Sequence, residues 1–164
     1  MAPPRRSRGW TVGVRYLLAG LSAGLLCACA AQPLEPAGSA LQPFTTDGCS
    51  MFPDRSLMGR ADWCGCCLAH DLKYWRGGTS DERLAADQQL RTCVAQVTGD
   101  TALADLMYAG VRSGGGPYFY TPYRWAYGWP FGRNYEPLSE AERARADELQ
   151  AQYQARNPAL TCPE

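Results

Sequence analysis

The sequence predicts a mainly α-helical domain that is cross-linked by disulfides and follows an export segment. Three observations lead to this fold class. Apolar residues recur at helical spacing in several segments of the 164-residue chain. Helix-capping residues and glycines separate these segments. Six cysteines remain after the export segment, and an even number of cysteines in an exported chain indicates disulfides, because the compartment outside the cytoplasm is oxidising.

Residues 1–28 are typical of a signal peptide. Four arginines accompany the apolar run Leu17–Leu26. This run is too short to cross a bilayer comfortably but has the length of a signal-peptide core. The tetrapeptide Leu26-Cys27-Ala28-Cys29 resembles a bacterial lipobox, which would make Cys29 a lipidated N-terminus. The alternative is ordinary cleavage, after one of three alanines: Ala28, Ala30 or Ala31.

These features predict an exported protein. It would be either a lipoprotein of the bacterial cell envelope, on the periplasmic side or at the outer membrane, or a secreted protein. Of the 16 basic residues, four arginines lie in residues 1–28, so 12 remain against 16 acidic residues and the net charge is near −4. A nucleic-acid-binding protein would need a basic face. We therefore expect no nucleic-acid partner, and we expect a monomer.

Residues 29–43 are rich in Ala, Pro, Gly and Ser and predict a flexible tether. The folded domain is accordingly expected over residues 44–164. It should open with a loop at 45–60, where glycine and proline recur without periodicity. A helix should follow, from an N-cap at Asp62 to about Trp75, before the Gly77-Gly78 pair ends it.

Three further helices are expected. The second should begin at Thr79 or Ser80 and run to about residue 97, with an apolar side formed by Leu84, Leu90, Val94 and Val97. The third, shorter helix should lie in the sequence TALADLMYAGVR at 101–112. The last should run from a capping box, Ser139 with Glu142, to about Arg156. It is expected to pack along a narrow stripe: Ala141, Ala144, Leu149 and Tyr153.

Residues 114–135 suit neither a helix nor a regular strand. Nine of these 22 residues are aromatic, half of the chain's 18, and they are set among glycines and prolines. Aromatic side chains such as Trp125 and Trp129 favour the headgroup level of a membrane, so the segment could be an interfacial surface. The interpretation we favour is a loop that covers the helix pair. Arg124 and Arg133 could contact phosphate in either case.

The stretch CGCCLAHDLKYW at 64–75 contains the chain's only histidine. Because the connection to the second helix is short, the two helices should lie antiparallel. If Cys66 bonds Cys93, Asp87 lies within about 3 Å along the axis of both His70 and Tyr74.

A carboxylate on one imidazole nitrogen fixes the tautomer and leaves the other nitrogen free as a base. Asp71 is turned about 100° from His70 on the helix and offers a second carboxylate to a nearby cation. This combination indicates activation of a water molecule beside an electrophilic metal ion.

Two other interpretations use the same residues. A zinc site could take Cys64, Cys66, Cys67 and His70, although adjacent cysteines on a helix do not match the usual C-x₂₋₄-C spacing. Alternatively, His70 is a structural hydrogen-bonding residue. Asp87 would then be a surface acid, paired with Arg83 or Arg91 at helical spacing.

Two motifs resemble the secreted phospholipase A2 superfamily. CCLAHDLKY at 66–74 is similar to the CCxxHDxCY helix of that family, and DQQLRTC at 87–93 is similar to its second-helix signature. The resemblance covers about residues 45–97. The family's third cysteine is Lys73 here and the usual partner of that cysteine is Ala86, so both halves of one disulfide are missing together.

The resemblance implies an antiparallel helix pair of phospholipase A2 type and calcium-dependent hydrolysis of the sn-2 ester of glycerophospholipids. His70 would be the general base that activates water, Asp87 would orient it, and Tyr74 would support Asp87. Asp71 would bind Ca²⁺. The resemblance also implies disulfides Cys66–Cys93 and Cys49–Cys67, which leaves Cys64–Cys162.

The calcium loop departs from the family's pattern. The family's loop is glycine-rich, whereas SMFPDRSLMG at 50–59 has bulky residues and a proline. Calcium needs several oxygen ligands, for which Asp47, Asp54 and the backbone carbonyl of Cys49 are further candidates. The alternative function is therefore a catalytically silent envelope lipoprotein of the same fold, which binds lipid or another protein.

Overall fold

A computed structural model of the protein describes residues 41–56 and 61–158. Over these residues the chain forms four α-helices and no β-strand: α1 (Cys64–Arg76), α2 (Ser80–Thr98), α3 (Thr101–Gly114) and α4 (Glu140–Arg156). The predicted mainly helical class is thus confirmed. The expected signal peptide, the lipidation site Cys29 and Cys162 lie outside the described residues. In the described part of the chain, no helix combines the length and the apolar character needed to cross a membrane.

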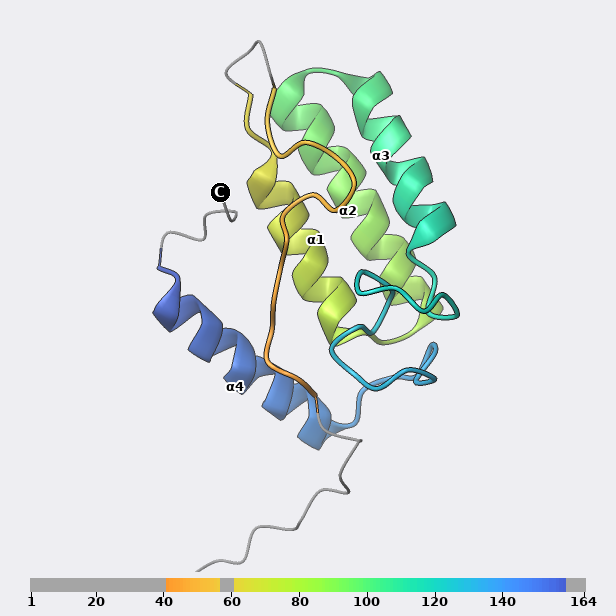
Figure 1. Ribbon diagram of the computed structural model, residues 1–164, viewed down its shortest axis with the longest axis vertical. Helices are drawn as coiled ribbons and strands as arrows, with labels where there is room; N and C mark the ends of the chain where they lie inside the picture. Colours follow the sequence, from red (N-terminus) through yellow and green to blue (C-terminus); the bar gives the residue numbers. More distant parts are fainter. Residues whose placement is uncertain (1–40, 57–60, 159–164) are drawn as a thin grey trace, which may run out of the picture. The chain divides into compact units, whose positions relative to one another are not determined.

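α1 and α2 form an antiparallel pair, and α2 lies between α1 and α3 (Figure 1). The chain reverses at Gly77 and Gly78, whose φ angles of 72° and 132° favour glycine. α2 then begins with a capping box, in which the Thr79 hydroxyl accepts from Glu82 N and the Glu82 carboxylate accepts from Thr79 N. The disulfide Cys66–Cys93 joins the two helices, with the Cα atoms 5.7 Å apart.

The helix boundaries differ slightly from the predicted ones. α1 begins at Cys64, and Trp63 rather than Asp62 occupies the N-cap position. Asp62 still contributes, because its Oδ1 accepts a hydrogen bond from Cys64 N at 3.0 Å. Trp63 is buried, and its indole Nε1 donates to Pro53 O at 2.7 Å. Trp63 forms no side-chain capping hydrogen bond, and its indole instead anchors the start of α1 to the preceding loop.

The predicted apolar sides of α2 and α4 are only partly correct. In α2, Leu90 and Val94 are buried but Leu84 and Val97 are exposed. The rest of the buried face consists of three other residues: Arg83, Ala86 and Asp87. In α4, Leu149 is buried together with Ala146, whereas the predicted Ala141 and Ala144 are exposed. α4 therefore packs through Ala146, Leu149 and the partly buried Tyr153, so two of the four predicted residues lie on its packing face.

Two groups of buried side chains form the core. The first surrounds Trp75 and includes Phe44, Trp125 and Leu149, which come from the start of the described chain, the aromatic segment and α4. The second surrounds the disulfides and includes Trp63, Val94 and Met107. α1 contributes to both groups, so the residues at its centre are held from two sides.

The folded part begins before the predicted domain boundary at residue 44. Leu41 is buried in the first core group. Gln42 N donates to Gly128 O at 2.8 Å, and Gln42 O accepts from Trp75 Nε1 at 2.8 Å. Leu41 and Gln42, which composition assigned to the tether, therefore pack against the aromatic segment and α1.

The aromatic segment covers the end of α1, as the favoured interpretation predicted for its tryptophans. Trp125 and Trp129 are buried. Their indole nitrogens donate to Gly78 O at 2.9 Å and Arg76 O at 2.8 Å, which satisfies carbonyls at and beyond the helix C-terminus. Other aromatic residues of the segment remain exposed: Tyr118, Phe119, Tyr120 and Phe131.

Candidate active site

The centre of the α1–α2 pair is a buried hydrogen-bonded triad. His70 Nε2 lies 2.8 Å from Asp87 Oδ1, and the Tyr74 hydroxyl donates to the same oxygen at 2.8 Å. His70 is 8% exposed and Asp87 is fully buried. His70 Nδ1 has no hydrogen-bond partner among the described residues. The pairing of Nε2 with the carboxylate thus leaves Nδ1 able to accept a proton.

Two arginines complete the surroundings of Asp87. Arg112, on α3, donates from Nη1 to Asp87 Oδ2 at 2.7 Å. Arg83, buried on α2, donates from Nε to the Tyr74 hydroxyl at 2.9 Å and lies 3.8 Å from Asp87 Oδ2. Asp87 is therefore not the surface acid of the alternative interpretation. The i,i+4 spacing pointed to Arg83, but no local pattern pointed to Arg112.

These contacts keep Asp87 ionised. Burial alone would raise its pKa, but hydrogen bonds from His70, Arg112 and Tyr74 hold the pKa below its usual value. The pKa of Tyr74 is raised, first by burial and then by the charge of Asp87, so its hydroxyl stays protonated as a donor. His70 thus faces an acceptor that is ionised at all pH values above the lowered pKa of Asp87.

A close approach at the end of α3 depends on glycine. A Cβ atom at Gly115 would lie 2.9 Å from the Tyr74 hydroxyl oxygen and 2.6 Å from Cε1 of the same ring. Tyr74 is fixed on its other side by Trp125, whose ring meets it edge-on at 5.1 Å between centroids. Gly115, which directly follows α3, therefore has a steric role in positioning the tyrosine.

His70 and Asp71 line a mostly apolar cavity of about 170 Å³. The other walls come from the loop at 48–52, from α2 and from α3, and include these apolar side chains: Phe52, Leu90, Met107 and Val111. A pocket with apolar walls and a few convergent polar groups is the usual form of a small-molecule site. The base candidate therefore opens onto a space suited to an apolar substrate.

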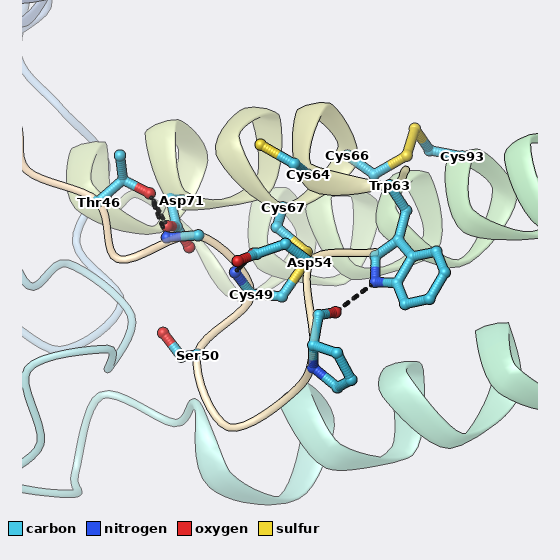
Figure 2. Close-up of a disulfide and its surroundings, with 12 residues drawn as sticks. Thr46, Cys49, Ser50, Asp54, Trp63, Cys64, Cys66, Cys67, Asp71 and Cys93 are labelled. Atoms are coloured by element: carbon cyan, nitrogen blue, oxygen red, sulfur yellow. Dashed lines mark hydrogen bonds between the residues drawn. A yellow bond between two sulfur atoms is a disulfide. The ribbon is translucent and has the colours of Figure 1, made fainter. Parts of the chain in front are cut away.

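Asp71 has a different environment from Asp87. Its Oδ2 accepts a hydrogen bond from the Thr46 hydroxyl at 2.6 Å (Figure 2). Burial raises the pKa of Asp71 to about 7, the Thr46 hydrogen bond lowers it, and the charges of Asp47 and Asp54 raise it further. No cationic side chain of the described residues forms an ion pair with Asp71. The carboxylate therefore carries an unfavourable charge near neutral pH.

The loop beside Asp71 is held by a disulfide and by its own carboxylate. Cys49 is bonded to Cys67, with Cα atoms 5.1 Å apart. Asp54 Oδ1 accepts from Cys49 N at 2.7 Å, and Figure 2 shows this carboxylate beside the backbone of Cys49. Gly48 has φ of 81°, and a Cβ there would lie 2.3 Å from Asp54 Oδ1. The Asp54 side chain therefore packs against the backbone of Gly48 and Cys49 in its own loop.

The donors near Asp71 fit calcium in type, because they are carboxylate, hydroxyl and backbone oxygens. In residues 41–56 and 61–158, however, no three His, Cys, Asp or Glu side chains converge as a metal site. Any ion would therefore need backbone carbonyls and water as well as Asp71. A zinc site is excluded at the predicted ligands, because Cys66 and Cys67 form the disulfides described above and Cys64 is also disulfide-bonded.

No protein-family model, curated protein or solved structure matches the chain. The likeness to phospholipase A2 therefore rests on the motifs of α1 and α2. The two disulfides within the described residues are the pairs that this likeness implies. Cys162, the partner implied for Cys64, lies outside them.

Proposed function

We propose that the protein is a phospholipase A2-type hydrolase that cleaves the sn-2 ester of glycerophospholipids in the presence of calcium. The observation that carries the proposal is a buried His70–Asp87 pair whose histidine opens onto an apolar pocket. The motifs at 66–74 and 87–93 support the same assignment.

In this proposal His70 is the general base. Asp87 holds the Nε2–H tautomer, so Nδ1 takes a proton from a water molecule in the pocket. The oxygen of that water attacks the ester carbonyl carbon to give a tetrahedral intermediate. His70 then returns the proton to the alcohol oxygen that leaves, and the fatty acid is released. Tyr74 and Arg112 keep Asp87 in place during both proton transfers.

Asp71 and backbone oxygens near Cys49 would hold the calcium ion. When bound, the ion would supply positive charge beside the ester oxygen and the phosphate, where negative charge develops or resides. A cation would also favour the ionised form of Asp71, whose neighbours Asp47 and Asp54 oppose ionisation. The apolar walls of the pocket would accommodate an acyl chain.

Export and a membrane-associated substrate belong to the same proposal. A phospholipid or membrane surface would be the partner, and an oxidising compartment outside the cytoplasm would preserve the disulfides. Lipidation of Cys29 would hold the enzyme at the cell envelope. Mass spectrometry of the native N-terminus distinguishes an acylated Cys29 from a free alanine.

Release of a labelled sn-2 fatty acid from a mixed-chain phosphatidylcholine tests the proposal. The wild type should release only the sn-2 chain with calcium and essentially none with a chelator. His70→Gln should reduce the rate by about 10³-fold, the scale of a lost general base. Lys73→Gln, an exposed change on the same helix, should leave it unaltered. Absent or calcium-independent release by the wild type would reject this function.

The alternative is a phospholipase A2-fold envelope protein without catalysis, which binds lipid or protein. One observation favours it: the Asp54 carboxylate is hydrogen-bonded to its own loop at Cys49 N and does not join Asp71 in a metal group. This alternative predicts that phospholipid binds without any release of fatty acid. It also predicts that His70→Gln leaves the binding unchanged.

A further inference from the structure

The aromatic segment lines another cavity, which is open to solvent, has a volume of about 410 Å³ and shares no lining residue with the pocket at His70. Its walls include six residues with aromatic or polar side chains: Tyr120, Thr121, Arg124, Tyr127, Trp129 and Phe131. The Tyr127 hydroxyl donates to Thr45 O at 2.6 Å, which ties one wall to the chain that precedes the calcium loop. The proposed hydrolysis uses none of these residues.

Arg124 is a buried cation without an opposing charge. It is 8% exposed, and one of its five N–H donors is used, from Nη2 to Trp129 O at 2.7 Å. Within the described part of the chain, no carboxylate lies within 4.0 Å of its guanidinium. Arg83, Arg112 and Arg133, by contrast, each reach an acid of this domain within that distance. The guanidinium nitrogens of Arg124 that lack a partner are not fully buried, so they can reach a ligand in the cavity.

A second polar group of the cavity also lacks a partner. Thr121 Oγ1 is buried and forms no hydrogen bond with any described residue. Thr121 and Arg124 belong to one turn, in which Arg124 N donates to Thr121 O at 3.4 Å. Thr121, with its unpaired hydroxyl, and Arg124, with unused guanidinium donors, thus both line the same cavity. Together they match the oxygens of a bound anion.

The outer part of the cavity is aromatic. The Phe131 ring lies 5.6 Å from Arg124 Cζ and meets Tyr120 edge-on at 5.1 Å between centroids. Tyr120 is 86% exposed and Phe131 is 49% exposed. Tyr118 and Phe119, in the same segment, are also exposed. Exposed aromatic side chains around an anion site suit the headgroup level of a bilayer, where apolar and polar groups meet.

We propose that this cavity binds the phosphate group of a phospholipid in a membrane surface. Arg124 and Thr121 donate hydrogen bonds to the phosphate oxygens, while Tyr120 and Phe131 lie among the headgroups. A planar guanidinium with several free donors matches phosphate geometry. This binding uses neither His70 nor calcium, so it can be tested independently of the proposed hydrolysis.

Sedimentation with vesicles of ether-linked phosphatidylcholine tests the site, with ether-linked glycolipid vesicles that contain no phosphate as the comparison. The ether bonds prevent hydrolysis, a chelator removes calcium, and the zwitterionic headgroup minimises the effect of net charge. The exported protein carries Cys29→Ser so that no attached lipid can bind vesicles. We expect binding to the phosphatidylcholine vesicles and much weaker binding to the glycolipid vesicles.

Four variants locate the interaction. Arg124→Gln should weaken vesicle binding by about ten-fold or more, since it removes charge-assisted hydrogen bonds, and Arg124→Lys should restore part of it. Arg145→Gln, the same charge change on the exposed face of α4, should bind as the wild type does. Thr121→Val should weaken binding by about three-fold or more, the scale of one neutral hydrogen bond. Because it removes only a buried hydroxyl, Thr121→Val decides the question if Arg124→Gln does not fold.

Equal binding to the two kinds of vesicle would overturn the proposal, and so would unchanged binding by Arg124→Gln and Thr121→Val. Titrations with glycerophosphocholine and inorganic phosphate separate the sources of phosphate. If these soluble ligands bind at Arg124 and vesicles do not, the site serves a free phosphate compound and the membrane assignment is wrong.

Discussion

Asp87 and Asp71 are two carboxylates of one candidate site, and the protein surrounds them in opposite ways. Asp87 is fully buried between helices, and His70, Tyr74 and Arg112 donate hydrogen bonds that keep its pKa low. Asp71 faces a loop and has one hydrogen-bond donor, Thr46, while burial raises its pKa to about 7.

The difference separates the two halves of the proposed mechanism. The half that moves a proton is complete within the protein, because helices on both sides supply the partners of Asp87. The half that stabilises negative charge is incomplete without a cation, because acidic residues surround Asp71. The comparison therefore predicts that equivalent substitutions at the two carboxylates have opposite effects on stability.

Asp87→Asn should give the largest effect. The change leaves Arg112 and Arg83 beside an uncharged amide, and breaking a buried charged pair costs about 3–5 kcal/mol of unfolding free energy. Because the pKa of Asp87 is lowered in the folded state, this stability is present above its ordinary value of 3.8 and is lost as pH falls through the lower folded value. Denaturant unfolding at neutral pH and in acid checks the loss and its disappearance in acid.

The disulfide between α1 and α2 should come next. Replacement of both Cys66 and Cys93 by serine opens a loop with a sequence separation of 27 residues. Chain-entropy arguments give about 3–4 kcal/mol for such a loop. Asp87 should then lose its fixed position against His70, so activity should fall together with stability. Unaltered activity in a folded double variant would show that packing alone sets the helix register.

The addition of calcium should stabilise the wild type and not Asp71→Asn. At 10 to 100 times the dissociation constant, a ligand specific for the folded state adds about 1–3 kcal/mol. Thermal unfolding with and without calcium, near neutral pH, measures this gain. Asp54→Asn is the companion variant. It tests whether the Asp54 carboxylate, which accepts a hydrogen bond from Cys49 N in the same loop, also takes part in calcium binding. If Asp71→Asn gains as much as the wild type, calcium binds elsewhere.

Asp71→Asn should itself raise stability without calcium, by a smaller amount. The folded pKa of about 7 lies above the ordinary 3.8, so the wild type loses stability as pH rises between these values and no more above them. The variant should lack this loss and be more stable near neutral pH by about 1–2 kcal/mol, well below the full value of the shift because the side chain is partly exposed. Equal pH profiles for the two proteins would contradict the environment described for Asp71.

The centre of the site could be predicted from the sequence because it depends on local periodicity and one cross-link. Antiparallel helices joined by a short turn have a fixed register, and this register brought His70, Tyr74 and Asp87 together. The starts of α2 and α4 could be predicted for the same reason, since a capping residue at Thr79 or Ser80 and a capping box at Ser139 and Glu142 involve only residues close in the sequence.

The features of the site that could not be predicted depend on contacts between segments that lie far apart in the sequence. Arg112 reaches Asp87 from α3, 25 residues further along the chain, and only the packing of α3 on α2 places it there. The hydrophobic pattern did not reveal the buried face of α2, because charged residues form part of that face. Thr46 bonds Asp71 across a loop that has no periodicity. Hydrophobic patterns carry no information about such polar contacts.

The most direct measurement is the tautomer of the single histidine in the chain. Nitrogen-15 NMR of the imidazole, on protein without a histidine tag in mildly alkaline solution, reports which ring nitrogen carries the proton. The account predicts a proton on Nε2, hydrogen-bonded to Asp87, and an unprotonated Nδ1; Asp87→Asn should disturb this signal and Asp71→Asn should not. A proton on Nδ1, or rapid averaging of the two forms, would mean that Asp87 does not prepare His70 as a base.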